Sequence, residues 1–397
     1  MNQKMYEEFL PIALILVCAK LFGMGSRKIF LPQVVGMLVA GIFLKICGIT
    51  TGPFIAEIAE FGVIMIMFTA GLETNIEDVK NTGFASLVVA SLGVLVPLAG
   101  GFVLYSLMHG GFAPIGSPEF ISAVFTGLII TATSVSITVD ALREMGKLHT
   151  KAGTIILSAA IIDDVIGVLL LSIVLGLRNP DVHPWMVLVK TVTFFGIVAV
   201  SGVIAHYIFK WLGKRYPHNR RVPIFGLVFC LLLSYIAEKW FGIADITGAF
   251  LAGIVLCNLR SAKYIVEKID TSAYMFFAPI FFVNIGLKTD FSGFSGKILI
   301  FAILFVIVAL LTKIIGCGIG AKLCKYSNKE ALRIGVGMMA RGEVCLIIAQ
   351  KGLSMGLFEA SYFPAIISLV IVASISTPII LKLLYKNKKE APLENSI

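Results

Sequence analysis

Residues 297–321 read KILIFAILFVIVALLTKIIGCGIGA, a run of 25 residues whose only charge after the first position is Lys313. A membrane-spanning helix needs about 20 predominantly apolar residues, so this run is long enough to cross a bilayer. The run is also continuous, whereas the strands of a membrane β-barrel alternate between apolar and polar residues. It therefore predicts a transmembrane helix with one ionisable side chain close to its middle.

The composition of the whole chain agrees with this prediction. Of its 397 residues, 58% are hydrophobic and 14% are charged. A soluble domain carries about 45–50% apolar and about 25% charged residues. The composition excludes a soluble enzyme and a disordered chain.

Thirteen apolar runs of this kind follow one another along the sequence. They fall at about 9–25, 32–47, 57–74, 84–108, 118–142, 150–177, 185–210, 222–240, 244–259, 271–287, 297–321, 329–352 and 361–385. The runs predict an all-α polytopic membrane protein with 13 transmembrane helices. The seven cysteines contain no CxxC pair, and no basic face is interleaved with aromatic residues. We therefore expect neither a resident metal or other cofactor nor a nucleic-acid partner.

The distribution of basic residues predicts the orientation. Counted over alternate connections and the tail, 22 of the 33 lysines and arginines lie on one side, 8 on the other and 3 within spans. Cytoplasmic connections carry the excess of positive charge, so the first side is cytoplasmic. We expect a multi-pass protein of the bacterial inner membrane, with the N-terminus outside, the C-terminus inside and a short cytoplasmic tail at 388–397.

An internal repeat is visible in two places. Residues 32–44, PQVVGMLVAGIFL, match residues 244–256, ADITGAFLAGIVL, and GLETN at 71–75 matches GLKTD at 286–290. By the predicted topology the matching spans run in opposite directions. An inverted repeat of this kind is typical of secondary transporters, which bind their substrate near the bilayer midplane.

The spans hold few ionisable residues, and these lie near the span middles. They are Asp163 and Asp164 in the sixth span, Lys313 in the eleventh, and Arg341 and Glu343 in the twelfth. A charge at the centre of a membrane helix costs about 2.5–3.5 kcal/mol, so intramembrane charges usually mark ion pathways. Three acids and two bases leave one carboxylate without a fixed partner. In a medium of low dielectric that group must take a proton or a bound cation.

Polar residues in the fifth span lie at the same depth. The stretch TATSVS at 131–136 contains Thr131, Thr133, Ser134 and Ser136, whose hydroxyls or freed backbone carbonyls are suitable ligands for sodium. Adjacent residues on a helix point about 100° apart. We therefore expect Asp163 to face Lys313 and Asp164 to face the ion path.

These residues resemble the monovalent cation–proton antiporter superfamily, in its NapA-like and Kef-like branch. The similar stretches are TATSVS at 131–136, VDALREMGKL at 139–148, AAIIDDVIG at 159–167, FAPIFFVNIGL at 277–287, LTKIIG at 311–316 and GMMARGEVCLIIA at 337–349. The resemblance implies a homodimer with the NhaA/NapA-like fold, in which two broken helices cross at the ion site and a core moves like an elevator. By position the broken helices are the fifth and twelfth spans.

The resemblance also implies a division of the chain. Dimer-domain helices occupy 1–80 and 216–292, core helices occupy 81–180 and 293–387, and 181–215 is a linker helix. Asp164 is then the main cation ligand, with Asp163 as the proton-linked partner of Lys313. Thr133 and Ser134 lie at the crossing, and Glu343 and Arg341 stabilise the break.

The function implied is electrogenic exchange of Na⁺ or Li⁺ for H⁺, without enzymatic chemistry. Paired aspartates are typical of the sodium-selective members, whereas the Kef potassium-efflux members carry Gln at the first position and append a nucleotide-binding domain. A K⁺(Na⁺)/H⁺ antiporter of the Kef type remains the alternative, because close relatives also move potassium. A cation channel could use the same acids, but an inverted repeat with a single midplane site argues against it.

Overall fold

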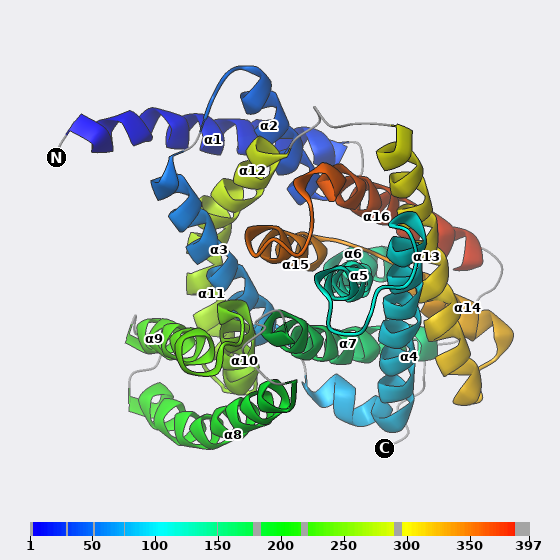
Figure 1. Ribbon diagram of the computed structural model, residues 1–397. Coiled ribbons are helices and arrows are strands. Elements are labelled where there is room, and N and C mark those ends of the chain that lie inside the picture. The colour runs from blue at the N-terminus through cyan, green and yellow to red at the C-terminus, as the bar shows by residue number, and fades with distance from the viewer. Residues whose placement is uncertain are drawn as a thin grey trace. The chain divides into compact units, whose positions relative to one another are not determined.

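A computed structural model describes residues 3–28, 31–50, 52–74, 76–148, 150–177, 184–215, 221–289 and 296–385. Within these ranges the chain is helical and contains no strand (Figure 1). Nine segments of the described chain are long and apolar enough to cross a membrane. The predicted all-α membrane class is therefore confirmed.

The chain divides into two compact units. The first comprises Met1–Ile29, Gln33–Ile76 and Leu175–Thr289, and the second Phe30–Pro32, Glu77–Val174 and Asp290–Ile397. Each unit is thus assembled from segments that are far apart in the sequence.

The first unit contains eight α-helices and two short π-helical turns. They are α1 (Gln3–Lys28), α2 (Gln33–Ile46), α3 (Pro53–Leu72), α8 (Pro184–Arg215), α9 (Arg221–Ile236), η1 (Ala237–Phe241), α10 (Asp245–Cys257), α11 (Ala262–Ser272), η2 (Ala273–Phe277) and α12 (Ala278–Lys288). The tenth span was predicted at 271–287, which places Lys263 and Lys268 in the connection before it. The structure instead places both lysines in α11, because an amphipathic helical segment precedes the apolar one.

Glycines let the helices of this unit approach one another closely. A Cβ added at Gly41 of α2 would lie 2.8 Å from the Cα of Gly286 in α12. A Cβ added at Gly71 of α3 would lie 3.0 Å from the Cα of Gly253 in α10. Since real Cβ atoms are essentially never closer than 3.0 Å to a foreign atom, the first crossing leaves no room for a side chain. Gly41 is aligned with Gly253 in the repeat, and Gly71 with Gly286.

The second unit contains the remaining helices. They are α4 (Ile76–Met108), α5 (Pro118–Ile129), α6 (Val135–Glu144), α7 (Lys151–Leu177), α13 (Gly296–Leu323), α14 (Asn328–Gly337), α15 (Glu343–Ser354), η3 (Ala360–Tyr362) and α16 (Phe363–Tyr385). Gly83 interrupts α4 with a φ of 51°, a left-handed conformation that glycine adopts without a steric penalty. α14 begins with a capping box, in which the Ser327 hydroxyl accepts from the Glu330 N–H and the Glu330 carboxylate accepts from the Ser327 N–H.

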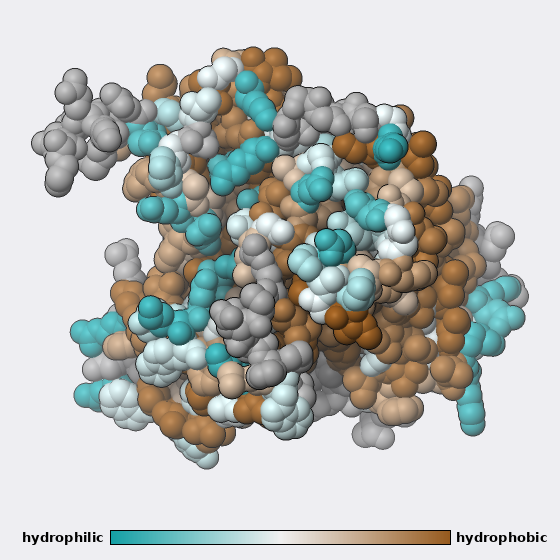
Figure 2. All heavy atoms as spheres, viewed as in Figure 1, coloured by the Kyte–Doolittle hydropathy of each residue, from teal (hydrophilic) through white to brown (hydrophobic). Residues whose placement is uncertain are grey.

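Two faces of α13 show how this unit meets its surroundings. Every fourth residue on one face is an exposed aliphatic, namely Leu299, Ile303, Ile307, Leu311, Ile315, Ile319 and Leu323. The other face carries the buried series Phe301, Phe305, Ala309, Lys313, Cys317 and Ala321. Exposed apolar stripes of this length are typical of helices that face lipid. Figure 2 shows apolar residues covering the side on which α13 lies in Figure 1. Lys313 therefore points into protein.

The close crossing at Gly41 predicts a large effect of added volume. We expect Gly41→Leu to lower the free energy of unfolding by about 1–3 kcal/mol or more, because overpacking displaces backbone rather than a flexible side chain. The matched control is Gly196→Leu in α8, since an added Cβ there meets nothing within 4 Å. Thermal melting of the two purified variants measures the difference. Equal melting temperatures would show that the α2–α12 crossing is not tightly packed.

Candidate functional site

Two helix interruptions meet in the second unit. α5 ends at Ile129 and α6 begins at Val135, while α14 ends at Gly337 and α15 begins at Glu343. The Ser134 N–H donates to the Ala340 carbonyl at 2.9 Å. A Cβ added at Gly342 would lie 2.7 Å from the Ser134 hydroxyl, so the glycine permits the close approach. The interruptions occur in the two spans where broken helices were expected.

Each interruption frees backbone carbonyls, which inside a membrane need donors from the protein. At the end of α5 these donors come from four different residues. The Leu128 carbonyl accepts from the Thr131 hydroxyl at 2.7 Å, and the Ile129 carbonyl from the Cys345 thiol at 3.4 Å. The Ile130 carbonyl accepts from Arg341 and the Thr131 carbonyl from Lys313, both at 2.7 Å.

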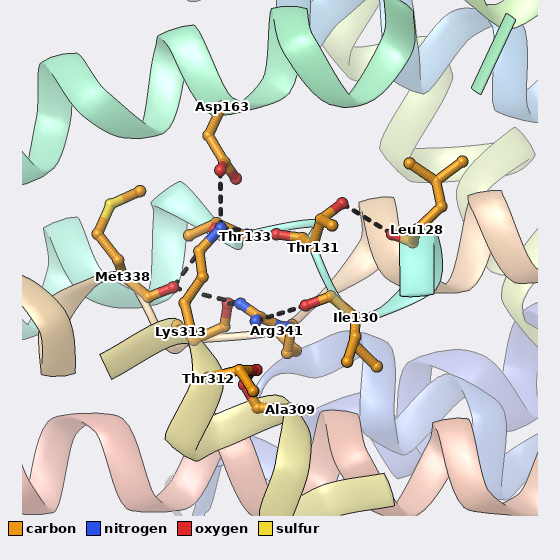
Figure 3. Close-up of polar contacts among 11 residues, drawn as sticks. Leu128, Ile130, Thr131, Thr133, Asp163, Ala309, Thr312, Lys313, Met338 and Arg341 are labelled. Carbon is orange, nitrogen blue, oxygen red and sulfur yellow. Dashed lines mark hydrogen bonds and ion pairs between the residues drawn. The ribbon is translucent and has the colours of Figure 1, made fainter. Parts of the chain in front are cut away.

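Arg341 is fully buried at the centre of this arrangement (Figure 3). Its Nη1 donates to the carbonyls of Met338 and Ala340, each at 3.2 Å, and its Nη2 donates to that of Ile130. The planar guanidinium can therefore bind carbonyls at the C-terminal ends of α14 and α5 together. These ends carry partial negative charge, so a cation there is stabilised. The charge count from the sequence paired Arg341 with a carboxylate, whereas its described side-chain hydrogen bonds all go to carbonyls.

Lys313 and Asp163 form a buried ion pair. The Lys313 Nζ lies 2.7 Å from the Asp163 Oδ1, and the side chains are 0% and 1% exposed. The same ammonium group donates to the Thr131 carbonyl of the first interruption (Figure 3). One cation thus connects α13, α7 and the end of α5, and the structure brings Asp163 and Lys313 together.

Carboxylate oxygens beside this pair have no described donor. They are Asp163 Oδ2 and Asp164 Oδ1, and both atoms are buried. Such an oxygen is costly to bury unless it takes a proton or a cation. The orphaned atoms therefore fit the hard-oxygen ligands that a sodium ion prefers.

The predicted hydroxyl ligands have separate positions. The Thr133 hydroxyl donates to the Met338 carbonyl at 3.3 Å, which leaves its oxygen lone pairs as acceptors. Ser134 is buried at the crossing, whereas the Thr131 hydroxyl is bonded within the end of α5. The side chain of Ser136 lies outside the described residues.

Glu343 occupies the first turn of α15 and is partly buried. A carboxylate in the first turn of a helix is stabilised by the partial positive charge of the N-terminus. Its position fits the predicted stabilisation of the break, and that role stays a prediction.

Sequence reasoning missed two hydroxyl donors at the second interruption. The Thr138 hydroxyl donates to the Gly337 carbonyl at 2.7 Å, and the Ser374 hydroxyl donates to the Arg341 carbonyl at 3.1 Å. The signal available for the second was SIST at 374–377, a polar run in the middle of the last apolar span.

The chain is similar to known transporters over nearly its whole length. The family model described as "Sodium/hydrogen exchanger, transmembrane" matches residues 13–386. The "Na(+)/H(+)-K(+) antiporter GerN" of Bacillus cereus is 38% identical over 393 residues, covering 97% of this chain and 98% of that one. The "Na(+)/H(+) antiporter" of Enterococcus hirae is 36% identical over 391 residues, covering 96% and 99%.

A solved structure has a similar fold. It is the sodium proton antiporter MjNhaP1 from Methanocaldococcus jannaschii, with a TM-score of 0.71 and 19% sequence identity, covering 97% of this chain and 98% of that one. At that identity the likeness bears on the fold alone.

The buried pair generates a stability prediction. We expect Lys313→Ala to lower the free energy of unfolding by about 3–5 kcal/mol, because it leaves the Asp163 carboxylate buried without its cation. The control is Lys297→Ala, which removes an exposed lysine from the same helix. Thermal melting of purified protein in detergent measures both variants. The double variant Asp163→Asn/Lys313→Ala should recover part of the lost stability. Equal melting of Lys313→Ala and Lys297→Ala would contradict the pairing.

Proposed function

Because the chain belongs to the sodium/hydrogen exchanger family, we propose that it is a secondary transporter that exchanges Na⁺ or Li⁺ for H⁺ at Asp164. The observation that carries this proposal is the buried Asp163–Lys313 pair beside Asp164 Oδ1, an oxygen without a described donor. A single carboxylate site can hold either a proton or a cation, and exchange follows when each displaces the other.

The ligands proposed for the cation are hard oxygens. Asp164 supplies the main carboxylate, and Asp163 supplies its second oxygen. The Thr133 hydroxyl is directed by its bond to Met338, which supports its oxygen as a third ligand. Ser134 is proposed as a fourth ligand from its burial at the crossing.

The charges in this arrangement support electrogenic exchange. In the proton-loaded site Asp164 is neutral, Asp163 is negative and Lys313 is positive, so the three groups sum to zero. When sodium enters between the two carboxylates and Lys313 releases its proton, the groups and the ion sum to −1. Two protons then move against one sodium, and one net charge crosses the membrane in each cycle.

A K⁺(Na⁺)/H⁺ antiporter is the second candidate. The specific observation in its favour is the 38% identity to GerN, whose name includes potassium. The two candidates share the site and differ in the ion that fills it.

The division of the chain supports an elevator-type movement. The residues proposed to hold the ion all belong to the second unit. The boundaries of the units lie close to those predicted for the core and for the dimer domain with its linker helix. We propose that the second unit carries the ion as a rigid core and that the first forms the interface of a homodimer.

Helix packing in the first unit supports the inverted repeat. The contact between Gly41 and Gly286 joins α2 to α12, and that between Gly253 and Gly71 joins α10 to α3. The repeat aligns Gly41 with Gly253 and Gly286 with Gly71, so the two contacts are equivalent in the two halves of the repeat. Thirteen spans result if α5 with α6 and α14 with α15 each cross once, and if the short α2 and α10 also cross. We place the protein in a bacterial inner membrane, with the N-terminus outside and the C-terminus inside.

Transport in proteoliposomes tests the function. With the interior made acid, we expect external Na⁺ and Li⁺ to dissipate the pH gradient and to generate a membrane potential, read by two dyes. Dissipation by K⁺ as well would favour the second candidate. A current carried by cations without any proton movement would identify a channel and contradict the proposal.

The same assay tests the site. We expect Asp164→Asn to abolish exchange, because an amide can neither release a proton nor bind a cation as a carboxylate does. The matched control is Asp270→Asn in α11, which makes the same chemical change in the other unit. Size-exclusion profiles and melting show whether both variants are folded. Normal exchange by folded Asp164→Asn would mean that the ion binds elsewhere.

A further inference from the structure

The buried hydroxyls of this chain have a common default hydrogen bond. In a membrane helix a Ser or Thr hydroxyl can donate to the carbonyl four residues earlier in its own helix. Thr126 donates to Ser122, Ser172 to Val168 and Thr377 to Ala373 in this way. This bond is within reach of a hydroxyl inside a helix, so a helical hydroxyl that donates to another element instead indicates an acceptor there that needs a donor.

Three buried hydroxyls donate instead to another element, and their acceptors are neighbours. Thr133 donates to Met338, Thr138 to Gly337 and Ser374 to Arg341. The Gly337 carbonyl belongs to the last residue of α14, and the Met338 and Arg341 carbonyls belong to the interruption between α14 and α15. Thr138 donates to Gly337 at the start of the non-helical segment, and Ser374 donates to Arg341 near its end.

Ser374 lies at the middle of α16 and is 1% exposed. Asp163 lies at the middle of α7, and Lys313 lies within about one turn of the middle of α13. Three uninterrupted helices thus direct one polar side chain each toward the interruptions at similar depth. α16 also packs against α6, α14 and α15, so it supports both interrupted helices.

The bond from Ser374 acts on the residue that closes the crossing. Arg341 accepts the Ser374 hydroxyl with its main-chain carbonyl, while its guanidinium donates to Ile130, Met338 and Ala340. A bond that holds the main chain of Arg341 therefore also holds the base of its side chain, whose guanidinium binds carbonyls at both helix ends.

We propose that Ser374 and Thr138 are positioning residues of the ion site, which hold the 337–341 backbone and through it the Arg341 guanidinium. The proposal rests on the proposed function for its transport consequence. Neither residue need touch the ion, because each acts through the backbone that it binds. Removing either hydroxyl leaves a buried carbonyl without its donor, and the interruption then relaxes.

Matched pairs of variants test this. Ser374→Ala is compared with Thr377→Val, which removes a buried hydroxyl bonded within the same helix, and with Ser374→Thr, which keeps the hydroxyl. Thr138→Val is compared with Thr126→Val in the same way, and decides the question if Ser374→Ala does not fold. The measurements are the half-saturating Na⁺ concentration for exchange and hydrogen–deuterium exchange of peptides that cover 337–345.

For Ser374→Ala and Thr138→Val we expect about a fivefold rise in half-saturating Na⁺, the factor that corresponds to the loss of one buried hydrogen bond. We also expect faster deuterium uptake at 337–345, with the controls and Ser374→Thr close to the wild type. If the test variants match their controls in both measurements, the positioning role is wrong. If the wild type exchanges no Na⁺, the proposed function fails, while the deuterium result still decides whether these hydroxyls hold the interruption.

Discussion

The Lys313 ammonium group is the point on which the second unit depends. It is fully buried and binds both the Asp163 carboxylate and the Thr131 carbonyl, at 2.7 Å each. Each of these groups is unfavourable alone in a membrane interior, since a charge needs its counter-charge and a freed carbonyl needs a donor. Lys313 supplies both the counter-charge for Asp163 and the donor for Thr131. Its direction follows from its place on the buried face of α13. The pair and the first interruption are therefore coupled.

Arg341 likewise supplies donors to freed carbonyls where both interruptions meet. Its guanidinium donates to carbonyls at two helix ends. Ser374 and Thr138 donate to the backbone around it. With the cations so engaged, buried oxygens of Asp163 and Asp164 are left without described donors. These oxygens are therefore the place we propose for the ion, because the described hydrogen bonds of Lys313 and Arg341 go to carbonyls and to one carboxylate oxygen.

Much of this could be predicted from sequence, for physical reasons that are easy to name. Apolar runs such as 297–321 identify membrane helices by length alone, and mid-span charges stand out because they are costly. The difference of about 100° between the directions of Asp163 and Asp164 follows from helix geometry. The early start of α11 was missed, because its first turns are amphipathic and Lys263 and Lys268 look like residues of a connection. The resemblance implied that Arg341 stabilises the break, but the carbonyls that it binds could not be predicted, since a carbonyl acceptor has no signature in a sequence. The polar run SIST at 374–377 does not tell which of its hydroxyls donates to another helix.

On the mechanism proposed above, one site, built on Asp164, holds a proton or a sodium ion but not both. The most direct measurement is the number of protons released when Na⁺ is added to the purified protein in weakly buffered detergent, read with a pH indicator. We expect proton release that saturates with Na⁺, is weaker at higher pH where the site is already deprotonated, and disappears in Asp164→Asn. Saturable Na⁺ binding without proton release, or the same release from Asp164→Asn, would contradict it.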